Sequence, residues 1–91
     1  MIYLIAYDIT NDSLRNLIKK YLSGWGRRVQ KSVFECDLKS DELKQVASHL
    51  KNLIKKETDR CHIYRLCAEC ISFRDVIGSD IEPDWGNTVV V

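Results

Sequence analysis

The feature that most constrains the fold is the run Ile2-Tyr3-Leu4-Ile5-Ala6-Tyr7 near the start of the chain, which is apolar almost without interruption. A run of strand length without polar alternation predicts a central β-strand that is buried on both faces. The run ends at Asp8, so the expected strand carries a carboxylate at its end. A rigid sheet presents functional groups at the ends of its strands, and Asp8 is therefore a candidate site residue.

The next segment has the spacing of an amphipathic helix that begins at one of the N-capping residues in 10–13 and ends at Gly24-Trp25-Gly26. Its basic residues Arg15, Lys19 and Lys20 lie off the apolar stripe and are expected to face solvent or a ligand. The stripe recurs at intervals typical of a helix and consists of Leu14, Leu17, Ile18, Tyr21 and Leu22.

Two further elements are expected in the middle of the chain. Residues 27–38 predict either one long strand or two short strands that are broken near Ser32. Ser40 is the expected N-cap of a second helix, and Lys55 and Lys56 are expected in its last turn, where the helix dipole favours cations. The apolar stripe of this helix consists of Leu43, Val46, Ala47, Leu50, Leu53 and Ile54.

The remainder of the chain is expected to be mostly extended. Residues 61–67 alternate as a strand does, a short extended piece follows at 73–77, and residues 78–86 form a loop. The chain ends Thr88-Val89-Val90-Val91, which is either a frayed apolar tail or an edge strand added to a partner protomer. We favour the added strand, because exposed β-branched apolar residues at a terminus are a liability.

The order strand, helix, one or two strands, helix, strand predicts an α+β fold of the ferredoxin-like split βαβ type (βαββαβ) with an antiparallel sheet. At 91 residues the chain has room for one such domain. We place it at residues 1–78, and residues 79–91 then form a C-terminal linker and edge strand. No apolar run is long enough for a membrane span, and the start lacks the basic region of a signal peptide. We therefore expect a cytoplasmic protein without membrane contact.

Charge is distributed unevenly along the chain, although 14 basic and 13 acidic residues nearly cancel. Residues 11–34 hold six basic residues against one acidic residue, whereas residues 71–91 hold one basic residue against four acidic ones. The first segment is basic enough to bind phosphate groups, and a solvated helix face is the alternative interpretation. The charge pattern leaves both interpretations open.

Several kinds of chemistry lack the residues that they need. The sequence has no glycine-rich phosphate loop and no paired-histidine zinc motif, and neither histidine has a nucleophile signature around it. Cys67-Ala-Glu-Cys70 is a lone CxxC, because Cys36, Cys61 and His62 stand at spacings of no standard zinc module. We interpret the cysteines as structural or incidental thiols.

The remaining candidates for chemistry are one carboxylate and a set of basic and aromatic residues. Mg²⁺ binds through one or two carboxylates with waters and substrate phosphates, and a two-fold dimer that brings both Asp8 side chains together supplies such a pair. A turn or a helix cap is the structural alternative for Asp8. Arginines that suit phosphate oxygens, and aromatic rings that either stack on bases or pack in the core, complete the set: Arg15, Arg27, Arg28, Tyr7 and Phe34.

Three stretches of the sequence resemble the Cas2 family, the small CRISPR-associated proteins of spacer acquisition. They are Tyr7-Asp8-Ile9, the stretch GRRVQKSVFE at residues 26–35, and Tyr64-Arg65-Leu66-Cys67. They stand in the family's order in a chain of the family's length, and the second stretch is the most specific.

The resemblance implies a ferredoxin-like homodimer in which the C-terminal strand packs against the sheet of the other subunit. It also implies that Asp8 is the catalytic residue and that two Asp8 side chains coordinate Mg²⁺, or Mn²⁺, for phosphodiester hydrolysis. By position in the matching stretches it implies nucleic-acid-binding roles for Tyr7, Arg27, Arg28, Ser32 and Phe34. It implies the same role for Arg15 by a looser match, since the first helix of the family varies in register.

Two functions follow from the resemblance. In the first, the protein is a metal-dependent endonuclease for single-stranded RNA or double-stranded DNA that takes part in the integration of new spacers. In the second, it is a non-catalytic dimer that bridges dimers of the CRISPR integrase and holds protospacer DNA. Both functions belong to the cytoplasm of a prokaryote and both use the basic segment, so the sequence does not choose between them.

Overall fold

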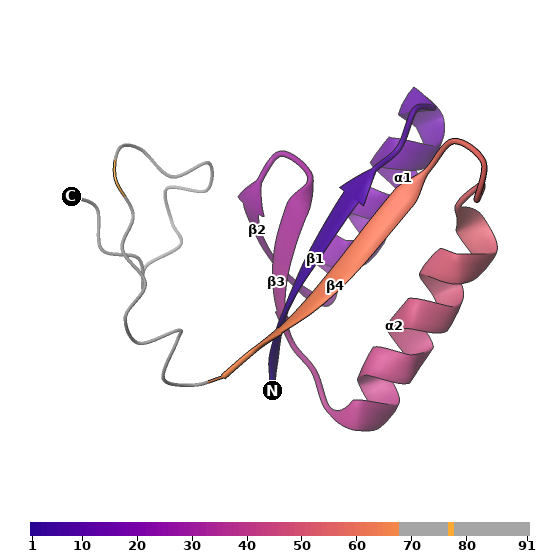
Figure 1. Ribbon diagram of the computed structural model, residues 1–91. Coiled ribbons are helices and arrows are strands. Elements are labelled where there is room, and N and C mark those ends of the chain that lie inside the picture. The colour runs from indigo at the N-terminus through magenta and orange to yellow at the C-terminus, as the bar shows by residue number, and fades with distance from the viewer. Residues whose placement is uncertain (68–76, 78–91) are drawn as a thin grey trace.

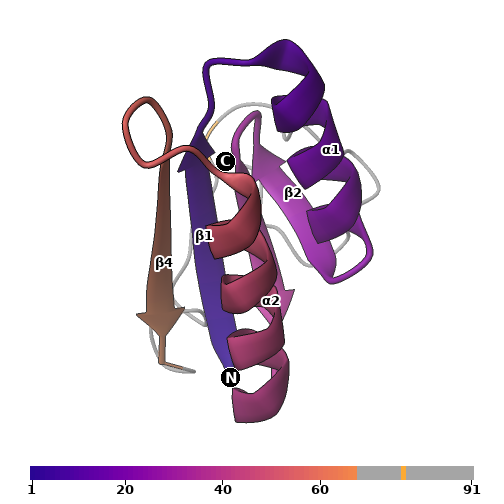
Figure 2. The same ribbon diagram turned by 90° about the vertical axis from the view of Figure 1, so that its right-hand side faces the viewer.

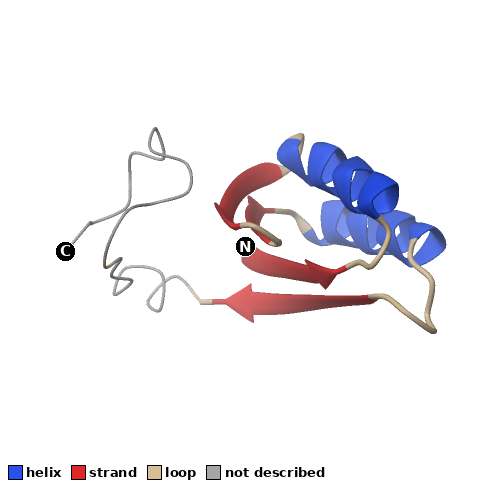
Figure 3. Cartoon of the chain, turned by 90° about the horizontal axis from the view of Figure 1, so that it is seen from above, coloured by secondary structure: helices blue, strands red, loops and turns tan. Residues whose placement is uncertain are grey.

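The computed structural model describes residues 1–67 and residue 77, which form four strands and two helices. The strands make one antiparallel sheet in the order β2-β3-β1-β4 (Figure 1). Both helices lie against the same face of this sheet (Figure 3). The α+β, ferredoxin-like prediction is therefore confirmed. The elements are β1 (Ile2–Asp8), α1 (Asp12–Ser23), β2 (Gly26–Gln30), β3 (Val33–Asp37), α2 (Ser40–Leu53) and β4 (Arg60–Leu66).

Three expectations concern residues outside the described part of the chain. They are the extended piece at 73–77, apart from Ile77, the domain boundary at residue 78, and the terminal strand at 88–91 with its exchange across a dimer. Within the described part, neither helix is long and apolar enough to cross a membrane.

β1 is the central strand, as predicted, but its two faces differ in burial. Tyr3, Ile5 and Tyr7 point toward the helices and are 8%, 0% and 4% exposed, whereas the alternate residues are half-buried or exposed. The prediction of a strand buried on both faces is thus wrong for the single chain, because both helices pack on one side (Figure 2). We call the other side the open face; its residues on β1 and their partners in register are Ile2, Leu4, Ala6, Asp8, Val33, Glu35, Asp37, Arg60, His62, Tyr64 and Leu66.

The core fills the space between the helices and the helix side of the sheet. Phe34 is 1% exposed and lies opposite Ile5 in the β1–β3 ladder. Both predicted helical stripes contribute to the core, although Leu17 at the edge of the first stripe is 51% exposed. The buried helical side chains are Ile18, Leu22, Val46 and Leu50.

The helices begin close to the predicted positions. Asn11, one of the expected caps, accepts a hydrogen bond through its Oδ1 from the Leu14 amide at 2.9 Å. Ser40, by contrast, is the first residue of α2 rather than its cap. Lys39 takes the N-cap position of α2. Its amide donates a hydrogen bond to the carboxylate of Glu42 in the first turn at 2.8 Å, which fixes the start of the helix.

The two-strand alternative for residues 27–38 is the correct one, with Lys31 and Ser32 in the turn between β2 and β3. Gly26, expected only to end the first helix, begins β2. A Cβ atom at Gly26 would lie 2.2 Å from the carbonyl oxygen of Glu35, so the close approach of the two strands requires glycine here.

Lys55 and Lys56 lie beyond α2 rather than in its last turn, because the chain leaves the helix at Ile54. Asp59 organises this turn: its Oδ2 accepts a hydrogen bond from the Lys55 amide at 3.0 Å. Its Oδ1 accepts hydrogen bonds from the amide and the hydroxyl of Thr10, both at 3.3 Å, so Asp59 joins the α2–β4 loop to the β1–α1 loop. The bond from the Lys55 amide lowers the pKa of Asp59, whose side chain is buried.

Asp59→Asn is expected to lower the thermal unfolding midpoint at neutral pH, because an amide nitrogen would face N–H donors. The folded-state pKa of Asp59 lies below its ordinary value of 3.8. Its contribution to stability is therefore present above that value and is lost as the pH falls through the folded-state pKa. The thermal unfolding midpoints of the wild type and of Asp59→Asn, measured by circular dichroism from about pH 7 to about pH 2, should become equal at acidic pH. A difference that stays constant to the lowest pH, or an equal loss in the exposed control Asp41→Asn, would contradict this role.

Candidate functional site

The predicted site residues divide between the two faces of the sheet. Asp8 is the last residue of β1 and is exposed on the open face. Tyr7, one position earlier, points to the helix side, because successive side chains of a strand alternate. Arg28 also lies on the helix side, since it pairs with the buried Phe34 in the β2–β3 ladder.

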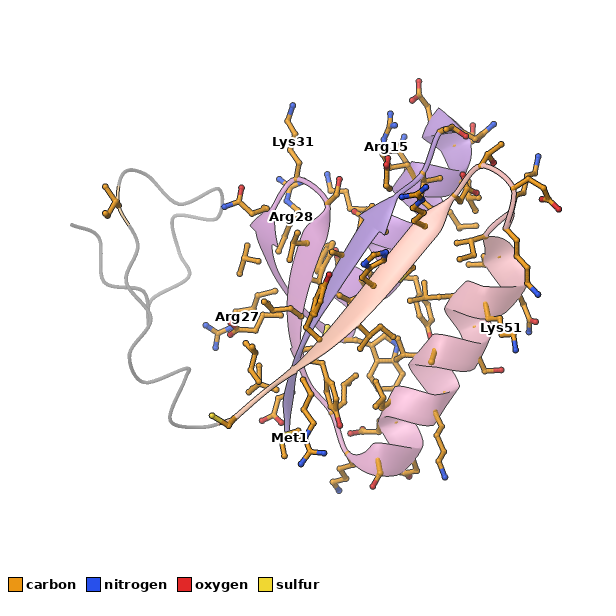
Figure 4. All side chains as sticks on the ribbon, viewed as in Figure 1. Met1, Arg15, Arg27, Arg28, Lys31 and Lys51 are labelled. Carbon is orange, nitrogen blue, oxygen red and sulfur yellow. The ribbon has the colours of Figure 1, made fainter. Side chains whose placement is uncertain are left out.

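A pocket of about 450 Å³ lies on the helix side, where α1 passes the end of β1 and the β2–β3 turn. Arg15, Arg28 and Lys31 gather at this end of the sheet (Figure 4). None of the residues that line the pocket carries a negative charge, so the pocket suits an anion such as a phosphate. The lining residues are Tyr7, Arg15, Asn16, Lys19, Arg28, Lys31 and Ser32, which we call the basic pocket.

The basic pocket contains four of the residues that the resemblance implied for nucleic acid binding: Tyr7, Arg15, Arg28 and Ser32. Asn16 was not expected at a site, and Lys19 and Lys31 were expected only as members of the basic segment 11–34. Lys19 carried a usable signal, because it follows Arg15 by four residues and so lies on the same side of α1.

Tyr7 contributes its hydroxyl to the pocket while its ring belongs to the core. The hydroxyl donates a hydrogen bond to the Lys31 carbonyl oxygen at 3.5 Å, and the ring stacks on Phe34 with a centroid distance of 6.3 Å. Burial raises the pKa of the Tyr7 phenol, and the positive charges of Arg28 and Arg15 oppose this in part. The phenol therefore stays protonated at neutral pH and can donate a hydrogen bond.

Arg15 is held beside the β1–α1 connection by two contacts. Its Nη1 donates to the Ile9 carbonyl oxygen at 3.1 Å, and its Nη2 pairs with the Asp12 carboxylate. These contacts orient the guanidinium at the pocket before any ligand is present, which lowers the entropy lost on binding.

Two of the implied nucleic-acid-binding residues lie away from the basic pocket. Arg27 is exposed and pairs with Glu35, so it lies on the open-face side of β2. It is also separated from Lys31, which follows the far end of that strand (Figure 4). Phe34 is buried in the core, so its ring has no free face for a base and the packing alternative accounts for it.

On the open face, the ladder between β1 and β4 places polar side chains near Asp8. Arg60 pairs directly with Asp8 in the register of the two strands. His62 pairs with Ala6, which is the next residue of β1 on the same face. The Nδ1 atom of His62 and the hydroxyl oxygen of Tyr64 lie 3.1 Å apart, within hydrogen-bond distance. The sequence gives no local signal for these neighbours of Asp8, because the register of β1 and β4, which are far apart along the chain, is not readable from local patterns.

Asp8 supplies a single carboxylate of the type that a divalent cation binds. In residues 1–67 and 77, no group of three or more His, Cys, Asp or Glu side chains is arranged to hold a metal ion. A carboxylate oxygen is the type of ligand that Mg²⁺ uses, and one or two carboxylates suffice when substrate phosphates and waters complete the shell. A second copy of Asp8 is therefore needed to build the predicted pair.

The described cysteines agree with structural roles. Cys36 is buried, and burial together with the charge of Glu35 raises the pKa of its thiol to about 11. Burial also raises the pKa of Cys61. Thiols of this kind are protonated and unreactive at neutral pH. Cys67 is exposed, and Cys70 lies outside the described residues.

Comparison with known proteins identifies the family. A family model described as "CRISPR associated protein Cas2" matches residues 1–73. The chain belongs to the Cas2 family. The Cas2 resemblance of its three sequence stretches is thereby confirmed.

Named Cas2 proteins are similar to this chain over most or all of its length. CRISPR-associated endoribonuclease Cas2 1 of Chloroflexus aurantiacus is 45% identical over 92 residues, covering 100% of this chain and 99% of that protein. CRISPR-associated endonuclease Cas2 of Halalkalibacterium halodurans is 38% identical over 71 residues, covering 72% and 74% of the two chains.

Solved Cas2 structures share the fold. Streptococcus pyogenes Cas2 matches with a TM-score of 0.77 and 26% identity, covering 86% of this chain and 100% of that chain. A chain of a partial Cas6-RT-Cas1–Cas2 complex matches with a TM-score of 0.67 and 28% identity, covering 80% and 86%. The ferredoxin-like Cas2 fold thus extends across the described part of this protein.

Proposed function

We propose that this Cas2-family protein is a metal-dependent endonuclease that hydrolyses phosphodiester bonds in single-stranded RNA or double-stranded DNA and takes part in spacer integration. The observation that carries the proposal is the exposed Asp8 carboxylate at the same end of the sheet as the basic pocket. The carboxylate suits a divalent cation, and the pocket suits the phosphates of a nucleic acid. The names of the relatives, endoribonuclease and endonuclease, support the same activity.

The active unit in this proposal is a homodimer that forms through the open face. That face presents apolar side chains from β1, and Tyr64 on β4 is 52% exposed. Apolar surface of this kind is typical of an interface between subunits. Two-fold pairing through the open face would bring the two Asp8 carboxylates toward each other.

The two Asp8 carboxylates would hold one Mg²⁺, or Mn²⁺ in its place. Such an ion supplies Lewis-acid polarisation of the scissile phosphate and makes water a stronger nucleophile at neutral pH. The chain supplies the binding: guanidinium and ammonium groups neutralise backbone phosphates, and two hydroxyls donate hydrogen bonds to phosphate oxygens. The groups in these roles are Arg15, Arg28, Lys19, Lys31, Tyr7 and Ser32.

A non-catalytic bridge is the second candidate function. A structurally similar chain comes from a complex whose description names Cas1 and Cas2 together. In this role the dimer would lie between dimers of the CRISPR integrase, in the cytoplasm of a prokaryote, and hold protospacer DNA in its basic pockets. Asp8 would be dispensable for such binding.

An incubation of the purified protein with end-labelled single-stranded RNA and with double-stranded DNA, each with Mg²⁺ or EDTA, tests the proposal. Cleavage of at least one substrate in Mg²⁺ and none in EDTA is the expected result. Cleavage that EDTA does not affect would overturn the metal-dependent mechanism. No cleavage of either substrate, with retention of the duplex in a complex with the integrase, would leave the bridging function as the account of this protein.

The double variant Lys19→Ala, Lys31→Ala is expected to bind nucleic acid more weakly and with less dependence on salt. Each lost phosphate contact lowers the slope of log K against log salt concentration by about 0.9 for duplex DNA and about 0.7 for single strands. Fluorescence anisotropy over a range of salt concentrations measures this slope. Lys44→Ala, Lys51→Ala on α2 removes the same charge away from the pocket, and equal slopes for the two double variants would exclude the pocket from the binding surface.

A further inference from the structure

Asp8 lies at the point where the sheet ceases to hold β1. The register of β1 against β3 ends at Ala6, and the Tyr7 amide then donates to the Ser32 carbonyl oxygen at 3.0 Å. Against β4 the register extends to Asp8 itself, which forms the last pair of that ladder with Arg60. The end of a strand frays easily, so the position of Asp8 depends on what holds the chain beyond this last pair.

Asp59 holds the chain directly beyond that pair. Its Oδ1 accepts hydrogen bonds from the amide and the hydroxyl of Thr10, both at 3.3 Å, and Thr10 follows Asp8 by two residues. Asp59 in turn directly precedes Arg60, the partner of Asp8 in register. The link between Asp59 and Thr10 therefore continues the β1–β4 ladder by one further tie between the two segments.

The side chain of Asp59 is itself held in one orientation. Its Oδ2 accepts a hydrogen bond from the Lys55 amide at 3.0 Å, and its own amide donates to the Lys55 carbonyl oxygen at 2.8 Å. The Thr58 hydroxyl donates to Oδ1 at 3.2 Å. Asp59 is 5% exposed, so neither solvent nor a change of rotamer easily replaces these bonds. A buried carboxylate with both oxygens bonded is a rigid support for the chain that it contacts.

We propose that Asp59 is a positioning residue for the metal site at Asp8: it fixes the end of β1 so that the Asp8 carboxylates of two protomers meet on one divalent cation. This inference rests on the proposed nuclease function and adds a supporting residue to its metal site. Ligand groups must be held to within roughly 0.5 Å. In a two-fold site a displaced end of β1 misplaces both carboxylates at once, so the support of this one strand end is decisive.

Binding of Mn²⁺ to the full chain, followed by the electron paramagnetic resonance signal of the free ion, tests this role without a cleavage assay. Asp59→Ala is expected to raise the dissociation constant for Mn²⁺ by roughly tenfold or more, as the loss of groups that orient metal ligands does. The Mg²⁺ concentration for half-maximal cleavage should rise by a similar factor. The matched control is Val46→Ala, which weakens the core from α2 and should keep the wild-type affinity for Mn²⁺.

Variants of Thr10 test the same link from its other side and keep the test decisive if Asp59→Ala does not fold. Thr10→Val has nearly the same shape, keeps the amide donor and loses the hydroxyl donor, so the dissociation constant for Mn²⁺ should rise by roughly threefold. Thr10→Ser keeps both donors and should bind Mn²⁺ as the wild type does. Thr10 is exposed, so both variants are expected to fold.

The outcomes separate this inference from the proposed function. Wild-type Mn²⁺ affinity in folded Asp59→Ala, beside lost binding in Asp8→Asn, would overturn the inference and leave the nuclease proposal standing. Equal losses in Asp59→Ala and Val46→Ala would also overturn the inference, because the effect would then be one of stability. Absence of Asp8-dependent Mn²⁺ binding by the wild type would overturn both. Asp8-dependent Mn²⁺ binding that Asp59→Ala weakens, without any cleavage, would overturn the nuclease function alone.

Discussion

Asp8→Asn is expected to reduce phosphodiester cleavage by roughly 10³-fold or more while the protein stays folded. A neutral amide is a poor ligand for Mg²⁺, and the loss of Lewis-acid stabilisation costs several kcal/mol at about 1.4 kcal/mol for each factor of ten. Asp8 is exposed at the end of β1, so the fold should change in stability by no more than about 0.5 kcal/mol. Single-turnover cleavage of labelled RNA and a urea titration measure the two effects.

The control for Asp8→Asn is Asp37→Asn, which removes an exposed carboxylate from the same face at the opposite end of the sheet. Asp37 pairs with Ile2 in register and its carboxylate accepts a hydrogen bond from the N-terminal ammonium at 3.0 Å. Asp37→Asn should cleave at the wild-type rate. Equal cleavage by the wild type and Asp8→Asn would show a contaminating nuclease, or a site that does not include Asp8.

Phe34→Ala is expected to lower the free energy of unfolding by about 3–5 kcal/mol. This is a large share of the roughly 5–15 kcal/mol that holds a small domain together. The ring is 1% exposed, packs against Tyr7 and lies opposite Ile5, so its removal leaves a cavity in the centre of the core. A loss of nucleic acid binding in this variant would therefore reflect unfolding, which urea titration monitored by circular dichroism measures.

Phe34→Leu separates packing from base stacking. Leucine fills most of the cavity and keeps the protein folded, but it has no aromatic face. We expect binding of RNA and DNA within about twofold of the wild type, since a lost base stack would cost 1–3 kcal/mol, or roughly fivefold or more. A folded Phe34→Leu protein that fails to bind would contradict the assignment of Phe34 to the core alone.

Local periodicity predicted the elements well because it reflects contacts within one helix or strand. The stripes that contain Ile18 and Val46 are buried as expected, and the break near Ser32 does separate two strands. The end of α2 was predicted less well. It depends on the hydrogen bonds of Asp59 to Lys55 and to Thr10, and Thr10 is 49 residues away along the chain.

The two halves of the candidate site were predicted to different extents. The sequence alone pointed to Asp8, from its place after a buried strand, and the resemblance pointed to Arg28. Neither showed that these two residues lie on opposite faces of the sheet. Burial of Phe34 decides which face Arg28 takes, because paired residues in a ladder share a face.

The sequence by itself determined the order of the elements, the family, and the residue types available for phosphate and metal binding. It did so because helical and strand patterns, like the motif stretches, are properties of neighbouring residues. Only the tertiary structure decided that α1 and the β2–β3 turn enclose one basic pocket and that His62 stands near Asp8. Strand register and helix placement arise from packing between distant segments, and one residue of slippage would move every side chain of a strand to the other face.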